Sequence, residues 1–86
     1  MPKIIMYKTP ICPYCHRATA LLRDKGVSDI HEIDISKDPS LRDEMMSKAG
    51  GRKTVPQIFI GDVHVGGFDD LYALNKKDEL DALLAS

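Results

Sequence analysis

The sequence predicts an α/β fold with a four-stranded mixed sheet flanked by helices, in the order β-α-β-α-β-β-α. In the first half of the chain, short β-branched runs alternate with segments of helical periodicity, which is typical of βαβ units. In the second half, two further β runs meet at a Gly–Asp pair, which indicates a hairpin. The length of 86 residues predicts a single domain over residues 1–86.

Residues 4–35 predict a strand, a helix and a second strand, in that order. Residues 4–7 form a short apolar run, which predicts a strand that is buried on both faces. The apolar spacing predicts a helix over residues 14–25, and Gly26 is expected to end it. Residues 30–35 read as the second strand, so this part of the chain predicts a right-handed unit with two parallel strands.

The second half begins with the other predicted helix. Asp38 is its expected N-cap, and Pro39 suits its first position. The segment QIFIGDVHV predicts an antiparallel hairpin that turns at Gly61–Asp62. The leucine-rich C-terminal segment predicts a last helix, interrupted near Asn75. Helices are therefore expected on both faces of the sheet.

Composition and charge narrow the class of protein. A formal net charge of −1 with 29% charged residues indicates an ordinary polar surface and no nucleic-acid partner. The N-terminal apolar run is too short for a signal peptide or a membrane span, so we expect a cytoplasmic protein with no membrane partner. In a reducing cytosol, a close cysteine pair is more often catalytic or metal-binding than structural.

Both cysteines of the chain, Cys12 and Cys15, lie in the motif CPYC. Pro13 suits the first turn of a helix, which places Cys12 at the helix N-terminus. Free N–H groups and the helix dipole stabilise a thiolate there, and such thiols have pKa values of about 3.5–7.5. Cys15 is expected one turn on, deeper and mainly protonated. The predicted nucleophile is therefore Cys12, and Cys15 is the resolving thiol.

Other interpretations of the cysteine pair are weaker. A structural zinc site needs four ligands, and the three histidines lack the spacing of a zinc finger, so we predict no metal site. The letters CPYCH also fit the attachment pattern of c-type haem. The setting of strand, C-x-x-C and helix favours redox chemistry instead.

Three motifs together resemble those of the glutaredoxin family, in particular its short bacterial dithiol members. They are CPYC after the first strand, TVPQIFI from Thr54 and GGFDDLYAL from Gly66, and the resemblance covers nearly the whole chain. It implies a thioredoxin-like fold, in agreement with the predicted order of elements. It also implies glutathione-dependent thiol–disulfide exchange, with glutathione as co-substrate and no tightly bound cofactor.

The resemblance further implies a glutathione site. Val55–Pro56 would be a cis bond, with the backbone of Val55 pairing with the cysteinyl residue of glutathione as an added strand would. The N–H groups of Phe68 and Asp69 would bind the γ-glutamyl carboxylate at a helix N-terminus, and Asp70 would accept from the neighbouring ammonium. As local structure, GGFDD predicts a turn and an aspartate N-cap. The expected set of glutathione-binding residues is Lys8, Tyr14, Arg42, Thr54, Val55, Pro56, Gly67, Phe68, Asp69 and Asp70.

Tyr14, Arg42 and Lys8 belong to this set because each matches, or nearly matches, one position of the family outside the motifs TVPQIFI and GGFDDLYAL. Tyr14 is expected to pack along the tripeptide. Arg42 would bind the glycine carboxylate if one residue is inserted at the double glycine that follows its helix, with Arg52 and Lys53 as neighbouring candidates. The family often has a lysine three residues before the first cysteine, whereas here Lys8 is one place earlier. It would reach the site only through a bulge in the strand.

The partners implied by the resemblance are glutathione and glutathionylated or disulfide-bonded proteins, with ribonucleotide reductase as a family substrate. We expect a monomer. One alternative is a module that binds a [2Fe–2S] cluster between two subunits through the first cysteine and glutathione, although Pro13 departs from the usual insert of cluster carriers. The other alternative is a thioredoxin served by a reductase, but the motifs TVP and GGFDD favour glutathione.

Overall fold

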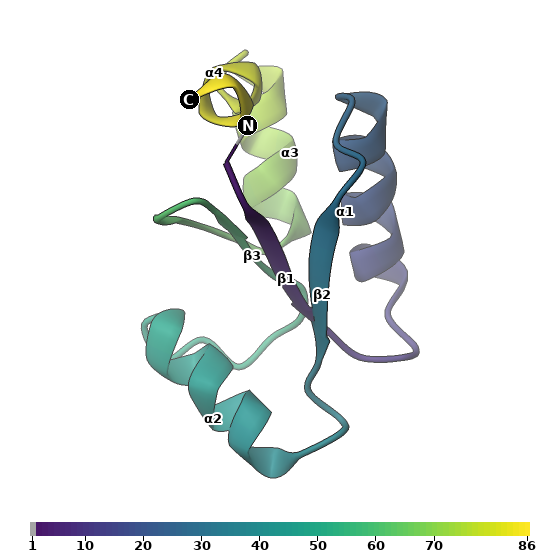
Figure 1. Cartoon of the computed structure of the whole chain (residues 1–86), viewed down its shortest axis with the longest axis vertical. Coiled ribbons are helices and arrows are strands. Elements are labelled where there is room, and N and C mark those ends of the chain that lie inside the picture. Colours follow the sequence, from purple (N-terminus) through teal and green to yellow (C-terminus); the bar gives the residue numbers. More distant parts are fainter. Residues whose placement is uncertain (1) are drawn as a thin grey trace.

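The structure is a computed structural model that describes residues 2–86, and a four-stranded sheet with the order β2-β1-β3-β4 forms its centre. The strands are β1 (Ile4–Lys8), β2 (Ile30–Asp34), β3 (Gln57–Ile60) and β4 (Val63–Gly66). β1 runs parallel to β2 and antiparallel to β3, and β4 is antiparallel to β3 (Figure 1). The predicted mixed sheet is confirmed, with β1 in its interior.

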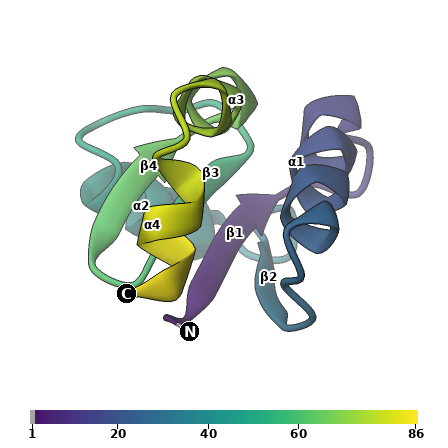
Figure 2. The same cartoon turned by 90° about the horizontal axis from the view of Figure 1, so that it is seen from above.

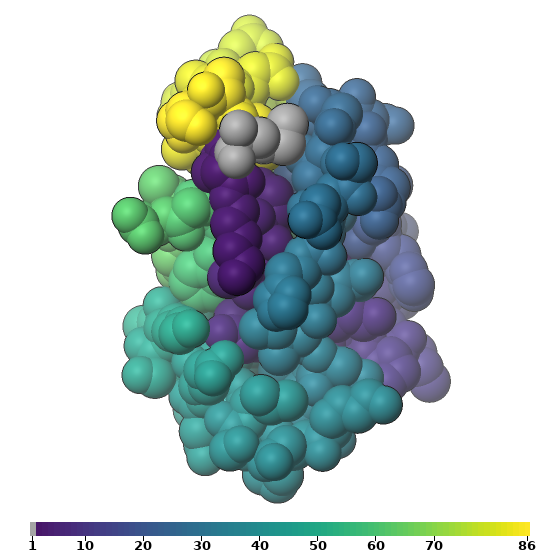
Figure 3. All heavy atoms as spheres, viewed as in Figure 1, coloured from purple at the N-terminus to yellow at the C-terminus, as the bar shows by residue number. Residues whose placement is uncertain are grey.

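Within residues 2–86, four helices cover the two faces of the sheet. They are α1 (Pro13–Asp24), α2 (Pro39–Lys48), α3 (Phe68–Lys76) and α4 (Leu80–Ala85). α1, α3 and α4 lie on one face, and α2 lies on the other (Figure 2). α2 covers only part of its face, so β1 remains visible above it on the molecular surface (Figure 3). None of these helices is long and apolar enough to cross a membrane.

The sheet separates two apolar clusters, and β1 contributes to both. Met6 points into the larger cluster, where it meets Leu71 of α3, and neither residue has exposed surface. Tyr7 points into the smaller cluster beneath α2, where it meets the buried Met45. Ile5 on this face is only partly buried. The alternation along β1 therefore buries both faces of the strand, as its apolar run predicted.

The predicted helix ends are mostly confirmed. The Asp38 carboxylate accepts a hydrogen bond from the Ser40 N–H at 2.9 Å, and Pro39 takes the first position of α2. α1 ends at Asp24, and the positive-φ glycine Gly26 follows its C-cap residue Lys25. The last predicted helix is interrupted as expected, and the break lies just beyond α3, where Asp78 has φ 59°.

The start of α3 differs from the prediction. Its N-cap is Gly67 and not an aspartate. Asp70, in the first turn, reaches back and accepts a hydrogen bond from the Gly67 N–H at 2.9 Å. The carboxylate therefore caps the helix from inside it, in the manner of the acidic residue of a capping box.

Candidate active site

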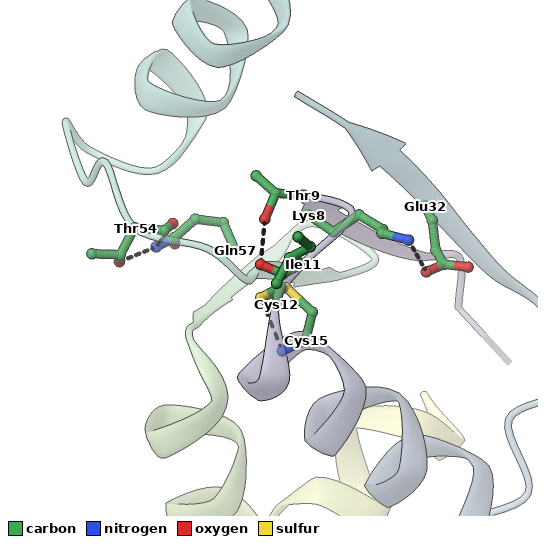
Figure 4. Close-up of a disulfide and its surroundings, with 8 residues drawn as sticks. All are labelled: Lys8, Thr9, Ile11, Cys12, Cys15, Glu32, Thr54 and Gln57. Carbon is green, nitrogen blue, oxygen red and sulfur yellow. Dashed lines mark hydrogen bonds and ion pairs between the residues drawn. A yellow bond between two sulfur atoms is a disulfide. The ribbon is translucent and has the colours of Figure 1, made fainter. Parts of the chain in front are cut away.

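Cys12 and Cys15 form a disulfide at the N-terminus of α1 (Figure 4). Cys12 is the N-cap residue, with an extended backbone, and its Sγ accepts a hydrogen bond from the Cys15 N–H at 3.1 Å. Pro13 follows at the first helical position, as its sequence position predicts. The Cys12 sulfur therefore faces a helix N–H and the positive end of the helix dipole, both of which favour a thiolate after reduction.

The predicted difference in depth between the two cysteines is small in this disulfide form. Cys12 is 5% exposed and Cys15 is 3% exposed. What separates the two residues is position, because Cys12 precedes the helix and its sulfur accepts the capping bond, whereas Cys15 lies inside the first turn. The assignment of roles therefore depends on the helix N-terminus rather than on exposure.

A pocket of about 360 Å³ adjoins Tyr14, which stands between the two cysteines in the sequence. Its lining residues come from the start of α1, the segment before β3 and the start of α3. They are Tyr14, Arg52, Thr54, Val55, Pro56, Gly67, Phe68, Asp69 and Asp70. All except Arg52 belong to the predicted set of glutathione-binding residues. A larger hollow of about 620 Å³ lies between β4 and α4. Neither cysteine lines either space, but Tyr14 of the CPYC motif lines only the smaller one.

One wall of this pocket is the segment from Thr54 to Pro56. The Val55–Pro56 peptide bond is cis, as the resemblance implied. Val55 packs against both apolar clusters through its side chain. Its backbone N–H and C=O have no backbone hydrogen-bond partner within residues 2–86. An extended peptide placed along this wall would therefore find a donor and an acceptor available.

The opposite wall is the first turn of α3, where Asp70 is held by two contacts. Its Oδ2 accepts from the Gly67 N–H at 2.9 Å and lies 3.0 Å from Arg52 Nη1. The Gly67 hydrogen bond, supported by the Arg52 guanidinium, lowers the pKa of Asp70 and outweighs the opposing effect of burial. The pocket therefore contains an oriented carboxylate that is ionised at neutral pH.

Comparison with known proteins decides the family. The glutaredoxin family model matches residues 4–65. The chain is 54% identical over 86 residues to a glutaredoxin of Pseudomonas aeruginosa, and the match covers 100% of both chains. This chain belongs to the glutaredoxin family. The solution structure of a glutaredoxin from Brucella melitensis is 57% identical, with a TM-score of 0.84 over 98% of this chain and 89% of that one.

The fold of a more distant family member is also the same. A crystal structure of a buckwheat glutaredoxin–glutathione complex has a TM-score of 0.87 at 23% identity, over 98% of this chain and 77% of that one. The thioredoxin-like fold predicted from the motifs is thus confirmed. As a glutaredoxin, the chain is a thiol–disulfide oxidoreductase whose redox-active pair is Cys12 and Cys15. Residues 2–86 contain no group of three or more His, Cys, Asp or Glu side chains that could hold a metal ion.

Two residues of the predicted set do not line the pocket of this glutaredoxin. Lys8 Nζ lies 3.5 Å from Glu32 Oε1 on β2, and its side chain extends toward that residue in Figure 4. Arg42 Nη2 donates to the Lys53 C=O at 3.3 Å, next to the segment that forms the pocket wall. The cation that does line the pocket is Arg52, which the sequence offered only as a neighbouring candidate.

Gln57 supports the pocket wall from behind, and sequence reasoning did not identify it. Its side chain is fully buried. Nε2 donates to the Thr54 C=O at 3.0 Å and lies 3.2 Å from Thr54 Oγ1 (Figure 4). Oε1 lies 2.8 Å from His64 Nε2, and the His64 ring stacks on Phe59. The signal in the sequence that could have identified this role is that Gln57 is the polar first residue of the otherwise apolar strand QIFI.

Proposed function

We propose that this glutaredoxin reduces glutathionylated and disulfide-bonded proteins, with glutathione as its co-substrate. The observation that carries the proposal is the pocket beside the helix N-terminal disulfide. This pocket offers an unpaired backbone at Val55, a helix N-terminus and the oriented carboxylate of Asp70. Glutathione has complementary groups, since it contains a peptide backbone, an α-carboxylate and an α-ammonium. The related buckwheat protein was solved as a complex with glutathione.

Each part of the tripeptide has a proposed partner. The cysteinyl backbone pairs with Val55, which directs its sulfur toward Cys12. The γ-glutamyl carboxylate accepts from the N–H groups of Phe68 and Asp69 at the start of α3. The adjacent ammonium donates to Asp70, whose ionised state the Gly67 N–H and Arg52 already favour.

The remaining members of the set surround this core of contacts. Tyr14 is half exposed at the pocket edge, where its ring can pack along the bound tripeptide. Thr54 and Pro56 shape the wall on either side of Val55. Arg42 stays a proposed partner of the glycine carboxylate, because its guanidinium lies at the Lys53 carbonyl beside that wall.

In the monothiol route, the Cys12 thiolate attacks the glutathione sulfur of a mixed disulfide. The Cys12–glutathione disulfide forms, and the substrate sulfur leaves as a thiolate that takes up a proton from water. A second glutathione thiolate then attacks the bound glutathione sulfur, releasing glutathione disulfide and restoring the Cys12 thiolate. Each exchange forms one S–S bond and breaks another, so no external oxidant is consumed.

In the dithiol route, the Cys12 thiolate attacks one sulfur of a protein disulfide and forms a mixed disulfide with it, while the other substrate sulfur leaves as the first thiolate. The Cys15 thiolate then attacks the Cys12 sulfur and expels the second substrate thiolate. The product on the enzyme is the Cys12–Cys15 disulfide, which is the form seen in the structure. Two glutathione molecules reduce this bond in two successive exchanges.

The experiment that tests the proposal is a coupled assay with a glutathionylated peptide, glutathione, glutathione reductase and NADPH. We expect turnover that depends on both the protein and glutathione. A parallel assay with thioredoxin reductase in place of the glutathione system should give no turnover, and the reverse result would identify a thioredoxin. Visible absorption of protein purified without oxygen tests the cluster-binding alternative, which requires the same Cys12 sulfur as an iron ligand.

A further inference from the structure

Three aromatic rings form a row that begins in the pocket and continues outside it. Tyr14 and Phe68 line the pocket, with their ring centroids 6.3 Å apart. Phe68 also stacks on Tyr72, at 5.9 Å between centroids, and Tyr72 is not part of the pocket lining. Tyr14 is 52% exposed and Tyr72 is 48% exposed. The rings therefore present a continuous aromatic surface that leads away from the disulfide.

A cation stands at each end of this surface. The Arg17 guanidinium carbon lies 5.2 Å from the centroid of the Tyr14 ring, and Lys76 Nζ lies 5.6 Å from that of Tyr72. We call these five residues the aromatic row: Arg17, Tyr14, Phe68, Tyr72 and Lys76. Both cations are exposed. Each of the two cations lies within the distance range of a cation–π contact with its ring, which holds the charged group beside that ring.

Helix geometry keeps the α3 part of the aromatic row in one line. Phe68, Tyr72 and Lys76 are spaced by four residues along α3, so they share one face of that helix. Tyr14 and Arg17 are spaced by three residues on α1, which packs beside α3 on the same face of the sheet (Figure 2). At 1.5 Å per residue, the part on α3 extends for about 12 Å.

The two cations have no carboxylate partner within residues 2–86. The ion pairs in this part of the chain are Lys8–Glu32, Lys25–Asp81 and Arg52–Asp70, and none includes Arg17 or Lys76. The acids closest in sequence to the α3 part of the row are Asp69 and Asp70, which line the pocket, and Asp78 and Glu79, which follow Lys76. The surface outside the pocket therefore combines exposed aromatic rings with two cations that form no ion pair within residues 2–86.

We propose that the aromatic row docks the polypeptide around the target cysteine of a protein substrate and favours segments that carry carboxylates near that cysteine. This rests on the proposed function, because it names the substrate class of the same site. In the proposed function glutathione occupies the pocket, whereas Tyr72 and Lys76 lie beyond the pocket lining. Extended peptide advances about 3.3 Å per residue, so the α3 part of the row matches about four residues of substrate. Aromatic contact supplies affinity, and the cations supply selectivity for acidic segments.

The test compares two peptides that each carry one glutathionylated cysteine and one leucine. In the first, aspartates lie within six positions on both sides of the cysteine; in the second, each aspartate is replaced by asparagine. We expect a kcat/KM about two- to fivefold higher for the acidic peptide at low ionic strength, which is the range for an exposed charge pair. The preference should shrink at 0.5 M salt because of screening. Equal kcat/KM values for the two peptides would overturn the proposal.

Variants on the outer part of α3 locate the effect. Lys76→Glu should remove the preference for the acidic peptide, whereas the matched variant Lys77→Glu, with the same change of charge one residue away, should retain it. Tyr72→Ser should lower kcat/KM for both peptides about fivefold by removing aromatic contact area. The same response in Lys76→Glu and Lys77→Glu would show that net charge alone acts, and would refute docking along the row.

A small substrate separates this proposal from the proposed function. Glutathionylated cysteine has no flanking peptide, so Lys76→Glu, Lys77→Glu and Tyr72→Ser should all reduce it at the unmodified rate. If the unmodified protein fails on this substrate, glutathione-dependent exchange itself is refuted. If the protein reduces it but does not distinguish the two peptides, only the docking proposal fails.

Discussion

Gln57 Oε1 and His64 Nε2 lie 2.8 Å apart and join β3 to β4 behind the pocket. An amide oxygen can only accept a hydrogen bond, so His64 donates through Nε2–H. The other end of the Gln57 side chain donates to Thr54. The Gln57 side chain therefore ties the wall that contains Val55 to the sheet by hydrogen bonds, in addition to the packing of the Val55 side chain, since Val55 itself makes no backbone hydrogen bond within residues 2–86.

Replacing Gln57 by leucine should loosen this wall. The change leaves the Thr54 C=O without its donor, but Thr54 is exposed and water can replace that bond. The free energy of unfolding should therefore fall by about 0.5–1.5 kcal/mol, the net contribution of a typical hydrogen bond. We expect KM for glutathionylated peptide to rise several-fold while kcat changes little. His64→Phe keeps a ring against Phe59 but removes the donor, so its effect should be smaller. A folded Gln57→Leu protein with unchanged KM would contradict the positioning role of this side chain.

The two cysteines should respond differently to substitution by serine. Cys12→Ser should reduce both deglutathionylation and protein disulfide reduction to background, because the thiolate at the helix N-terminus is lost. Cys15→Ser should retain deglutathionylation and lose the dithiol reaction. Steady-state rates with a glutathionylated peptide and with a disulfide-bonded protein measure the two reactions. Equal losses in the two variants would refute the assignment of nucleophile and resolving thiol.

The Asp70 carboxylate should link the pocket to acid stability. Because the folded-state pKa of Asp70 is lowered, first by the Gly67 N–H and then by Arg52, its stabilising effect is present above the ordinary value. That value is about 3.9, and the effect is lost as the pH falls through the lowered pKa. Asp70→Asn should therefore flatten the fall in the free energy of unfolding below about pH 4.

The same substitution should weaken glutathione binding, because asparagine has no charge for the γ-glutamyl ammonium. We expect KM for glutathionylated peptide to rise about tenfold, the range for a lost hydrogen bond between charged groups. Asp69→Asn removes the same charge one residue earlier and is the matched control. A larger effect of Asp69→Asn on KM would move the ammonium site to that side chain.

Tyr7 should make the fold sensitive to alkaline pH. Its hydroxyl donates to Glu44 Oε2 at 2.8 Å, and burial, with the hydrogen bond to Glu44 and the Glu44 charge, raises the pKa of Tyr7 from 10.0 to about 12. A raised pKa means that the stabilising effect is complete below pH 10 and is lost as the pH rises toward 12. Denaturant unfolding across this range should show the loss.

Tyr7→Phe isolates this contribution, since it removes the hydroxyl and keeps the ring. The free energy of unfolding at neutral pH should fall by about 1.5–3 kcal/mol, the range for a hydrogen bond to a charged group. The further loss between pH 10 and 12 should become smaller than in the unmodified protein. Tyr72→Phe, at an exposed position, is the control, and an equal change in both variants would count against the Tyr7–Glu44 contact.

Local sequence signals predicted most of the secondary structure. Asp38–Pro39 and Cys12–Pro13 each start a helix, and Gly61–Asp62 turns the hairpin, because these pairs limit the backbone conformation within a few residues. The N-cap of α3 was assigned wrongly. Both aspartates of GGFDD lie inside the first turn of α3, and Gly67 is the N-cap because Asp70 reaches back to its N–H.

The site was predictable as a set of motifs, but its side-chain pairs were not. Arg52 and Asp70 are 18 residues apart in the sequence. Their contact requires the first turn of α3 to face the segment before β3. Lys8 meets Glu32 only because β1 and β2 are parallel neighbours in a particular register. Such pairs depend on tertiary packing, which spacing along one chain does not describe.

The sulfur atoms of Cys12 and Cys15 are part of the same apolar cluster as Leu22 and Leu71. Formation and cleavage of the Cys12–Cys15 bond therefore take place against closely packed apolar side chains, which must adjust when the two sulfur atoms move together or apart.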